Sequence, residues 1–279
     1  MILIADSGST KSDWALTVGE NKNILFNTKG FNPFFHDEDF ILNHLGKVDQ
    51  LQGINDKVKH VFFYGAGCSS KEMNAIIEKA LSKFFTSANI NVDHDLMACA
   101  LSTYDGNPGI SCILGTGSNS CFYDGNQLNE AVPALGYILG DEGSGSYYGK
   151  KLLTDYLYNM LPADIHSDLE NTFHISKGAI FENVYMKPDA NTYLASFMKF
   201  ISNHRNAQYV DTMLTDGMKH FMQVHVCCYK QYREVPCHFI GSVSFHFKEQ
   251  LLKAAKELNV SVGNIIKKPI DGLIKYHLR

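Results

Sequence analysis

Two short segments rich in glycine, serine and threonine have the residue types of a phosphate-binding loop. The first covers residues 6–11 and follows the apolar stretch 2–5, and the second covers residues 115–119 and follows 111–114. Backbone N–H groups can converge on an anion only where small side chains let the chain come close. Either segment alone is equally consistent with a polar hairpin tip, because glycine and serine are common turn residues. Two such segments, each directly after an apolar strand, favour the phosphate interpretation.

The candidate contacts within these segments are small, hydroxyl-bearing or cationic residues, namely Ser9, Thr10, Lys11, Gly115, Thr116, Gly117 and Ser118. Asp6, just before the first turn, offers a carboxylate that can hold Mg²⁺, usually through water because Mg²⁺ dehydrates reluctantly. The GxxxxGK[ST] pattern of a Walker loop is absent from the sequence. A second apolar stretch rather than a helix follows each turn, so neither segment fits a Rossmann fingerprint.

Two more aspartates stand where a strand is predicted to pass into a helix. Residues 91–100 read NVDHDLMACA, which places Asp95 at the start of the helix and Asp93 two positions earlier. Asp95 is most simply interpreted as the N-cap of the helix, a position that aspartate favours. A carboxylate exposed at a strand end can also take a proton from a substrate. The segment alone leaves both roles open.

Two polar segments allow both a structural and a binding role. Asn32 lies in the turn GFNP at residues 30–33, and its amide can bind sugar hydroxyls as donor and acceptor. Glycine and Asn-Pro also form turns without any ligand. Asp141 and Glu142 precede a predicted helix, where one of them is expected to supply favourable charge at the helix start.

The last turn of small residues is GSVS at residues 241–244, directly after an apolar strand at 238–240. Ser244 or a neighbour could cap a helix predicted over 247–258. The small residues Gly241 and Ser242 could equally make room for a nucleoside. Both interpretations stay open from the residues alone.

The two glycine-rich turns lie about 110 residues apart, which indicates an internal repeat and two related halves. Each half is expected to be mixed α/β, because short apolar strands alternate with apolar residues at helical spacing. The predicted elements are strands 61–64, 90–92 and 238–240, and helices 71–86, 96–104, 147–161, 211–228 and 247–258. Residues 162–202 show no clear pattern and are where a family-specific insertion is expected.

Composition and charge argue against several classes of partner. The chain has 279 residues and a formal net charge of -4 without a basic patch, so nucleic acid is not an expected partner. No apolar run approaches the roughly 18 residues of a membrane helix. The N-terminus lacks a basic leader, which predicts a cytoplasmic protein without membrane association. The seven cysteines show no CxxC spacing and are interpreted as reduced thiols.

Four motifs connect the chain with a known family: DSGSTKSDW at residues 6–14, GTGSNS at 115–120, GDEGS at 140–144 and GSVS at 241–244. In this order they resemble the BadF/BadG/BcrA-type ATPases of the actin-like (hexokinase and actin) superfamily, and more narrowly the N-acetylglucosamine kinases. The resemblance implies an α/β fold of two ribonuclease-H-like (actin-like ATPase) domains with an interdomain nucleotide cleft. It places the domains at residues 1–106 and 107–279, with the final helix able to pack back on the first domain.

The resemblance also implies an activity, which is phosphoryl transfer from ATP with Mg²⁺ to a sugar hydroxyl. The expected acceptor is O6 of N-acetylglucosamine or a related amino sugar. In this scheme Asp95 is the general base, with Asp93 as the alternative, and Asp6 binds the metal. Gly241 and Ser242 border the adenosine. The implied sugar contacts are Asn32, Asp95, Asn119, Gly136 and Asp141.

The chain departs from the family pattern at Leu135, where the mammalian N-acetylglucosamine kinase has a tryptophan. Leucine can contact a sugar face but cannot stack on it as tryptophan does, so recognition of the N-acetyl group stays open. Glucosamine, N-acetylmannosamine and N-acetylmuramic acid are alternative substrates. A BadF-type ATPase that activates a partner enzyme and a nucleotide-binding sensor without turnover are alternative functions. Such activators resemble iron–sulfur proteins, and the cysteine spacing of this chain does not support a cluster. Whether the protein forms a homodimer is left open.

Overall fold

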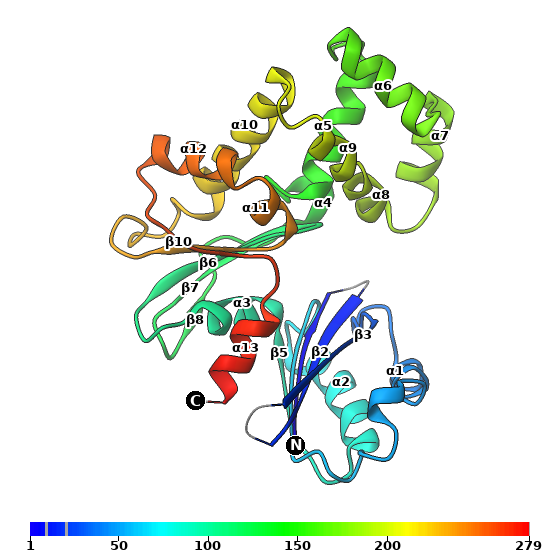
Figure 1. The fold of residues 1–279 in the computed structure, drawn as a ribbon, viewed down its shortest axis with the longest axis vertical. Coiled ribbons are helices and arrows are strands. Elements are labelled where there is room, and N and C mark those ends of the chain that lie inside the picture. Colours follow the sequence, from blue (N-terminus) through cyan, green and yellow to red (C-terminus); the bar gives the residue numbers. More distant parts are fainter. Residues whose placement is uncertain (9–10, 20–21, 279) are drawn as a thin grey trace. The chain divides into compact units, whose positions relative to one another are not determined.

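The computed structural model describes residues 1–8, 11–19 and 22–278. Ser9 and Thr10, two of the expected nucleotide contacts, lie outside the described residues. The chain forms two compact units, Met1–Tyr104 together with Pro269–Arg279, and Asp105–Lys268. We refer to them as the first and the second unit, and Figure 1 labels most of their elements.

The first unit is built on a five-stranded sheet in the order β3-β2-β1-β4-β5. Its strands are β1 (Ile2–Ser7), β2 (Lys11–Val18), β3 (Lys22–Lys29), β4 (His60–Gly65) and β5 (Asn89–His94). The first three strands form an antiparallel meander, whereas β4 and β5 run parallel to β1. Parallel strands need crossover connections, and helices supply them here. This strand order is the ribonuclease-H-like arrangement that the resemblance implies.

Helices cover both faces of the first sheet (Figure 1). They are α1 (Glu38–Leu45), α2 (Lys71–Phe84), α3 (Asp95–Thr103) and α13 (Ile270–His277), with a 3₁₀ turn at Asp49–Leu51. α1 packs against α2, and α3 packs against α13. Asp37 and Ser70 cap α1 and α2 through their side-chain oxygens, as expected for these residue types.

An aromatic core lies between the first sheet and the pair α1 and α2. Trp14 is 1% exposed, and its ring packs against Phe26, Phe31 and Phe63 at centroid distances of 5.9–6.3 Å. The indole N–H donates to Thr28 Oγ1 at 2.8 Å, so the polar end of the ring is satisfied. This packing joins β2, β3 and β4 close to the first glycine-rich turn.

The second unit repeats the topology of the first with a five-stranded sheet in the order β10-β9-β6-β7-β8. Its strands are β6 (Gly109–Leu114), β7 (Ser118–Tyr123), β8 (Leu128–Asn129), β9 (Cys237–Ile240) and β10 (Val262–Ile266). β6, β7 and β8 are antiparallel, and β9 and β10 run parallel to β6. Read by position in the sheet, both units have the order 3-2-1-4-5, which agrees with two related halves.

The helices of the second unit are α4 (Gly136–Leu139), α5 (Gly145–Leu157), α6 (Ala163–Phe173), α7 (Lys177–Phe181), α8 (Ala190–Ser196), α9 (Met198–Asn203), α10 (Gln208–His225), α11 (Ser242–His246) and α12 (Lys248–Leu258), with a π-helical turn at Glu182–Met186. Residues 162–202, which showed no pattern in the sequence, are therefore a group of short helices. Their apolar residues, such as Ile165 and Phe200, join the core of this unit. Within the described residues, no helix is long and apolar enough to cross a membrane.

Candidate functional site

The second glycine-rich turn is fastened to the first turn of α5 by backbone hydrogen bonds. The N–H of Gly115 donates to the carbonyl of Gly117 at 3.0 Å and closes the turn. The carbonyl oxygens of Gly115 and Thr116 accept from the N–H groups of Gly145 and Ser146 at 2.8 and 3.0 Å. The beginning of α5 therefore binds the loop itself, and its N–H groups are used before any ligand arrives.

Asp141 packs behind this loop. Its Oδ1 accepts from the backbone N–H of Ser118 at 3.1 Å. A Cβ on Gly117 would come within 2.9 and 3.0 Å of the two carboxylate oxygens, so a larger residue there would require the Asp141 side chain to shift. Burial raises the pKa of the Asp141 carboxyl, the negative charge of Glu142 adds to this, and the Ser118 hydrogen bond opposes it.

The residues after Asp141 complete the contact with the loop. Ser118 Oγ donates to the carbonyl of Glu142 at 2.8 Å. Ser144 is the N-cap of α5 and accepts from the N–H of Tyr147 at 3.2 Å. The expectation that Asp141 or Glu142 supplies charge in the first turn of this helix is therefore wrong, because the helix starts at Gly145 and its first turn contains no acidic residue. A serine directly before the helix was the signal that the sequence offered.

Gly241 lies beside the same loop because β9 runs parallel to β6. Ile240 is in register with Ile113, so the next residues of the two strands are neighbours at the carboxyl ends of the sheet. Gly241 has a φ of +128°, and a Cβ there would overlap the carbonyl of Leu114. Ser242 begins α11, a separate short helix, and the N-cap of α12 is Phe247. The alternative in which Ser244 caps the helix over 247–258 is therefore wrong.

Two other predicted sugar contacts of the second unit, Asn119 and Gly136, come shortly after Ser118 and shortly before Asp141 along the chain. Asn119 follows Ser118 along β7 and so points to the opposite face of the sheet, where its amide donates to Glu130 at 3.3 Å. Gly136 has a φ of +68° and begins α4. The apolar side chains around it are exposed, at 54% for Leu135 and 71% for Ile138.

The first unit gathers carboxylates on one face of its sheet. Asp6 of β1 is in register with Asp13 of β2 and with Tyr64 of β4, and Tyr64 is in register with Asp93 of β5. Residues in register project from the same face, so these side chains form one row. Lys11 contacts the row through an ion pair with Asp13 at 3.3 Å and is half exposed. Asp6 thus lies in a row of carboxylates that Lys11 contacts.

Asp95 is the first residue of α3, and the cap position belongs to His94, which makes no side-chain cap hydrogen bond. The N-cap interpretation of Asp95 is therefore wrong. Asp93 Oδ1 accepts from the N–H of His94 at 2.8 Å and so shapes the entry into the helix. Burial raises the pKa of the nearby Cys68 thiol to about 12, and the charges of Asp95 and Asp93 contribute. Cys68 therefore stays protonated, as expected for a structural cysteine.

Asn32 is 5% exposed and is held by its own turn. Its Oδ1 accepts from the backbone N–H of Phe34 at 3.0 Å. A Cβ on Gly67 would lie 2.5 Å from this oxygen, so the turn after β4 approaches Asn32 only because glycine stands there. The structural role of Asn32 is thus visible in the structure, and its role toward a sugar stays a prediction.

Two buried serines connect this turn to the first hairpin, and sequence reasoning missed them. Ser7 Oγ accepts from the N–H of Phe31 at 2.9 Å and from the hydroxyl of Ser12 at 2.6 Å. Both serines are 0% exposed. No local signal separated them from the other small residues of the loop, because Phe31, the backbone partner of Ser7, lies 24 residues away in the sequence.

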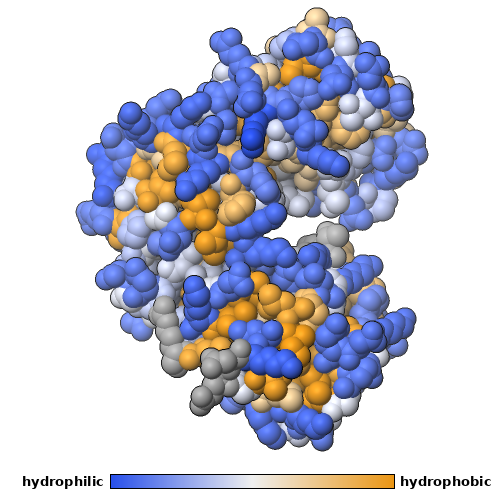
Figure 2. Space-filling model, viewed as in Figure 1, coloured by the Kyte–Doolittle hydropathy of each residue, from blue (hydrophilic) through white to orange (hydrophobic). Residues whose placement is uncertain are grey.

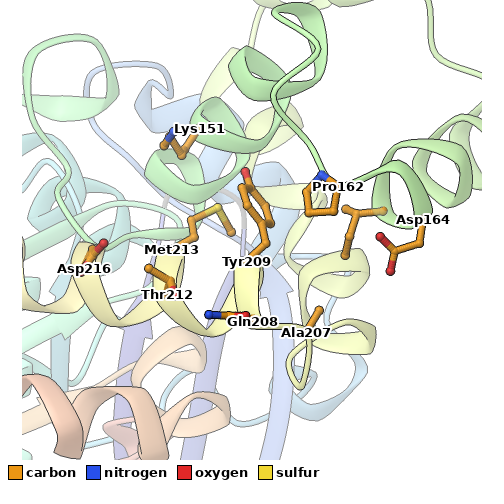
Figure 3. Close-up of a pocket in the computed structure, with 10 residues that line it drawn as sticks. Lys151, Pro162, Asp164, Ala207, Gln208, Tyr209, Thr212, Met213 and Asp216 are labelled. Carbon is orange, nitrogen blue, oxygen red and sulfur yellow. The ribbon is translucent and has the colours of Figure 1, made fainter.

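A cavity of about 690 Å³ lies elsewhere in the second unit, among α5, α6 and α10 (Figure 3). Its charged lining includes Lys151, whose ammonium lies 2.7 Å from both oxygens of the buried Asp155. Tyr209 donates to the same carboxylate at 2.6 Å. Asp155 is therefore satisfied by its neighbours, and no predicted site residue lines this cavity.

Both sheets have the strand order 3-2-1-4-5, and in each unit small residues connect the first two strands in chain order. These features define the class of protein as the actin-like ATPase fold of sugar kinases. A protein from Porphyromonas gingivalis that is provisionally named an N-acetylglucosamine kinase has 36% sequence identity, with a TM-score of 0.95 over 100% of this chain and 99% of that chain. The chain therefore belongs to the family of that protein.

More distant structures share the fold. A provisionally named N-acetylglucosamine kinase from Chromobacterium violaceum has 16% identity and a TM-score of 0.72, covering 100% of this chain and 98% of that chain. A ROK-family glucokinase from Streptomyces griseus, solved with glucose and AMPPNP, has 14% identity and a TM-score of 0.55 over 99% and 97% of the chains. No protein-family model matches the sequence, and no curated protein does.

Proposed function

We propose that the protein transfers the γ-phosphoryl group of ATP to a hydroxyl of an amino sugar, with O6 of N-acetylglucosamine as the acceptor. The observation that carries the proposal is the meeting of the 115–117 loop, Asp141 and Gly241 at one end of the second sheet. The sequence supports the same proposal, because the chain is 36% identical to a protein that is provisionally named an N-acetylglucosamine kinase. The distant glucokinase solved with AMPPNP supports the nucleotide part.

The second unit suits the phosphates of ATP. A Cβ placed on Gly115 would meet no atom of the described residues within 4 Å, so the backbone of the loop is open to a ligand. Backbone N–H groups in such a turn can bind an anion without a cationic side chain. Gly241 and Ser242, at the neighbouring strand end, would border the nucleoside. Asp141 would bind the sugar from its place behind the loop.

The first unit carries the carboxylates that would bind Mg²⁺ and accept the proton of the sugar hydroxyl. Asp6 and Asp13 offer carboxylate oxygens, which Mg²⁺ prefers as ligands. The described residues contain no group of three or more His, Cys, Asp or Glu side chains that could hold a metal. An ion bound here through one or two carboxylates, water and substrate phosphates would neutralise charge on the transferred group. Asp95 would accept the proton of the attacking hydroxyl, and Asn32 would orient the sugar.

The proposal is tested by measuring ADP release with a panel of amino sugars and identifying the product by mass spectrometry. The panel contains N-acetylglucosamine, glucosamine, N-acetylmannosamine and N-acetylmuramic acid. We expect ADP release that depends on one of them and a phosphosugar in equal amount. ATP hydrolysis that no sugar changes would instead support an activating ATPase. Nucleotide binding without any turnover would support a sensor.

Replacing Asp95 with asparagine tests the general base. Loss of general-base catalysis lowers kcat by about 10²–10⁴-fold. We expect that loss in Asp95→Asn with unchanged affinity for an ATP analogue, because Asp95 would contact the sugar hydroxyl and not the nucleotide. Asp93→Asn is the matched control two residues away and should keep most of the activity. Full activity in Asp95→Asn together with loss in Asp93→Asn would transfer the role to Asp93.

A further inference from the structure

One stripe of α10 packs against the turn that follows Asp141. Gly217, Phe221 and His225 are four residues apart and therefore lie on one side of the helix. Gly143 has a φ of +66°, and a Cβ there would come within 2.9 Å of the Phe221 Cβ and 3.1 Å of the Gly217 carbonyl. The helix and the turn are thus in direct backbone contact.

His225 ends this stripe and is 3% exposed. Its Nε2 lies 3.1 Å from Oε2 of Glu142. Its ring stacks on Phe221 with centroids 5.1 Å apart and an interplanar angle of 22°. Its backbone carbonyl accepts from the hydroxyl of Ser120 at 2.6 Å, which joins the end of α10 to β7. The imidazole therefore has one fixed orientation, with Nε2 directed at Glu142.

The second ring nitrogen identifies the tautomer. Nδ1 of His225 is buried and has no hydrogen-bond partner among the described residues. An N–H at this position would be an unsatisfied buried donor, whereas an unprotonated nitrogen leaves only a lone pair without a partner. The proton of neutral His225 is therefore on Nε2, which donates to the Glu142 carboxylate.

Hydrogen bonds hold both the side chain and the backbone of Glu142. Its carboxylate accepts from His225, and its backbone carbonyl accepts from Ser118 Oγ at 2.8 Å. Ser118 also donates its N–H to Asp141, the residue before Glu142. A change in the conformation of Glu142 would therefore move Asp141 and Ser118 together, and with them the end of the 115–117 loop.

We propose that His225 is a positioning residue for phosphoryl transfer, which fixes Glu142 through Nε2–H and thereby holds Asp141 and the 115–117 loop in their binding geometry. This inference rests on the proposed function of that loop. His225 itself touches neither the loop nor Asp141 among the hydrogen bonds described. Its contribution is to hold the Nε2–H donor in one direction. The position of His225 is set by α10, the helix that follows residues 162–202.

Two substitutions separate the donor from the shape of the side chain. His225→Phe keeps an aromatic ring on Phe221 and removes the donor, whereas His225→Gln keeps an N–H near the position of Nε2. Mutation of an outer hydrogen-bond partner that orients a metal ligand lowers affinity or activity by about 10–100-fold, and we take the same scale for a partner that orients Glu142. We expect this fall in kcat for His225→Phe and a change of about threefold or less for His225→Gln. His220→Phe, an exposed histidine on the same helix, is the control and should match the wild type.

The tautomer gives a readout that does not depend on activity. Two-dimensional ¹⁵N–¹H spectra of the histidine side chains should show His225 protonated at Nε2 and unprotonated at Nδ1. A ring that is protonated at Nδ1 and unprotonated at Nε2 overturns the inference, even if His225→Phe does not fold. Full activity in folded His225→Phe, or equal losses in both variants, also overturns it.

Binding of a nonhydrolysable ATP analogue separates this inference from the proposed function. If the wild type phosphorylates no sugar, weaker analogue binding in His225→Phe but not in His225→Gln still supports the positioning role. Equal binding in all three proteins then contradicts it.

Discussion

Replacing Gly241 with alanine tests the second-unit site, because two separate physical reasons require glycine there. Its φ of +128° is a conformation that residues with a side chain rarely adopt. A Cβ at this position would overlap the carbonyl oxygen of Leu114 and lie 2.6 Å from the carbonyl carbon. It would also lie 3.2 Å from the backbone nitrogen of Gly115. The substitution therefore acts on the point where the loop begins.

The size of the effect follows from these distances. Ordinary contacts between carbon atoms are about 3.5–4.0 Å long, so the ends of β6 and β9 must separate by roughly 1 Å. The backbone strain alone costs about 1–3 kcal/mol, which corresponds to a fall in Tm of roughly 2–12 °C for a domain of this size. A displacement of about 1 Å in a site can lower catalysis by 10²-fold. We expect a fall in kcat/KM of that order for Gly241→Ala.

The assay combines thermal unfolding, titration with a nonhydrolysable ATP analogue and sugar phosphorylation at saturating ATP. Gly178→Ala is the matched control, because Gly178 lies in α7 and the nearest atom to its added Cβ is Ser176 Oγ at 4.0 Å. The control should keep its activity and keep or slightly raise its Tm. If Gly241→Ala has the same Tm and nucleotide affinity as this control, the close approach of β9 to the loop is wrong.

Two further predictions concern pH. Burial raises the pKa of Asp141 above its usual 3.8, so the charged carboxylate opposes folding at neutral pH. Asp141→Asn should therefore raise Tm at pH 7, although it should lose phosphoryl transfer. The gain in Tm should vanish below about pH 3.8, where the carboxyl is protonated in both the folded and the unfolded protein. Burial lowers the pKa of His277 from 6.5 to about 4, so the wild type should lose stability as the pH falls between these values. His277→Phe keeps the stacking on Phe62 and should flatten that part of the Tm profile, and an unchanged profile would contradict the assignment.

Local features of the sequence were enough to predict the two hairpins and their repetition. Short apolar runs that end in glycine and serine form a strand and a turn in either unit, because the signal lies within about ten residues. The strand order within each sheet was not a local property. It came from the resemblance, and the structure agrees with it in both units.

The features that sequence reasoning missed depend on contacts between distant segments. The spacing of Gly217, Phe221 and His225 is that of any amphipathic helix, and only the fold brings it to Glu142, 83 residues earlier. The short helices of residues 162–202 are too brief for a periodic pattern to stand out. The capping error at Asp95 arose because one residue of shift in a helix start decides which side chain reaches the free N–H groups.

The two hairpins share a topology but differ in charge, and this difference assigns their roles under the proposed function. Asp6 and Asp13 stand in register at the first hairpin, where Lys11 already pairs with Asp13 and where Mg²⁺ would further offset the carboxylate charge that a phosphate meets. The turn at Gly115–Gly117 contains no charged side chain of its own, so an anion would meet less repulsion within this turn than beside Asp6 and Asp13. Under the proposed function, duplication of one strand order would yield a cation-binding hairpin and an anion-binding hairpin. The two hairpins would then differ in the charge of their side chains.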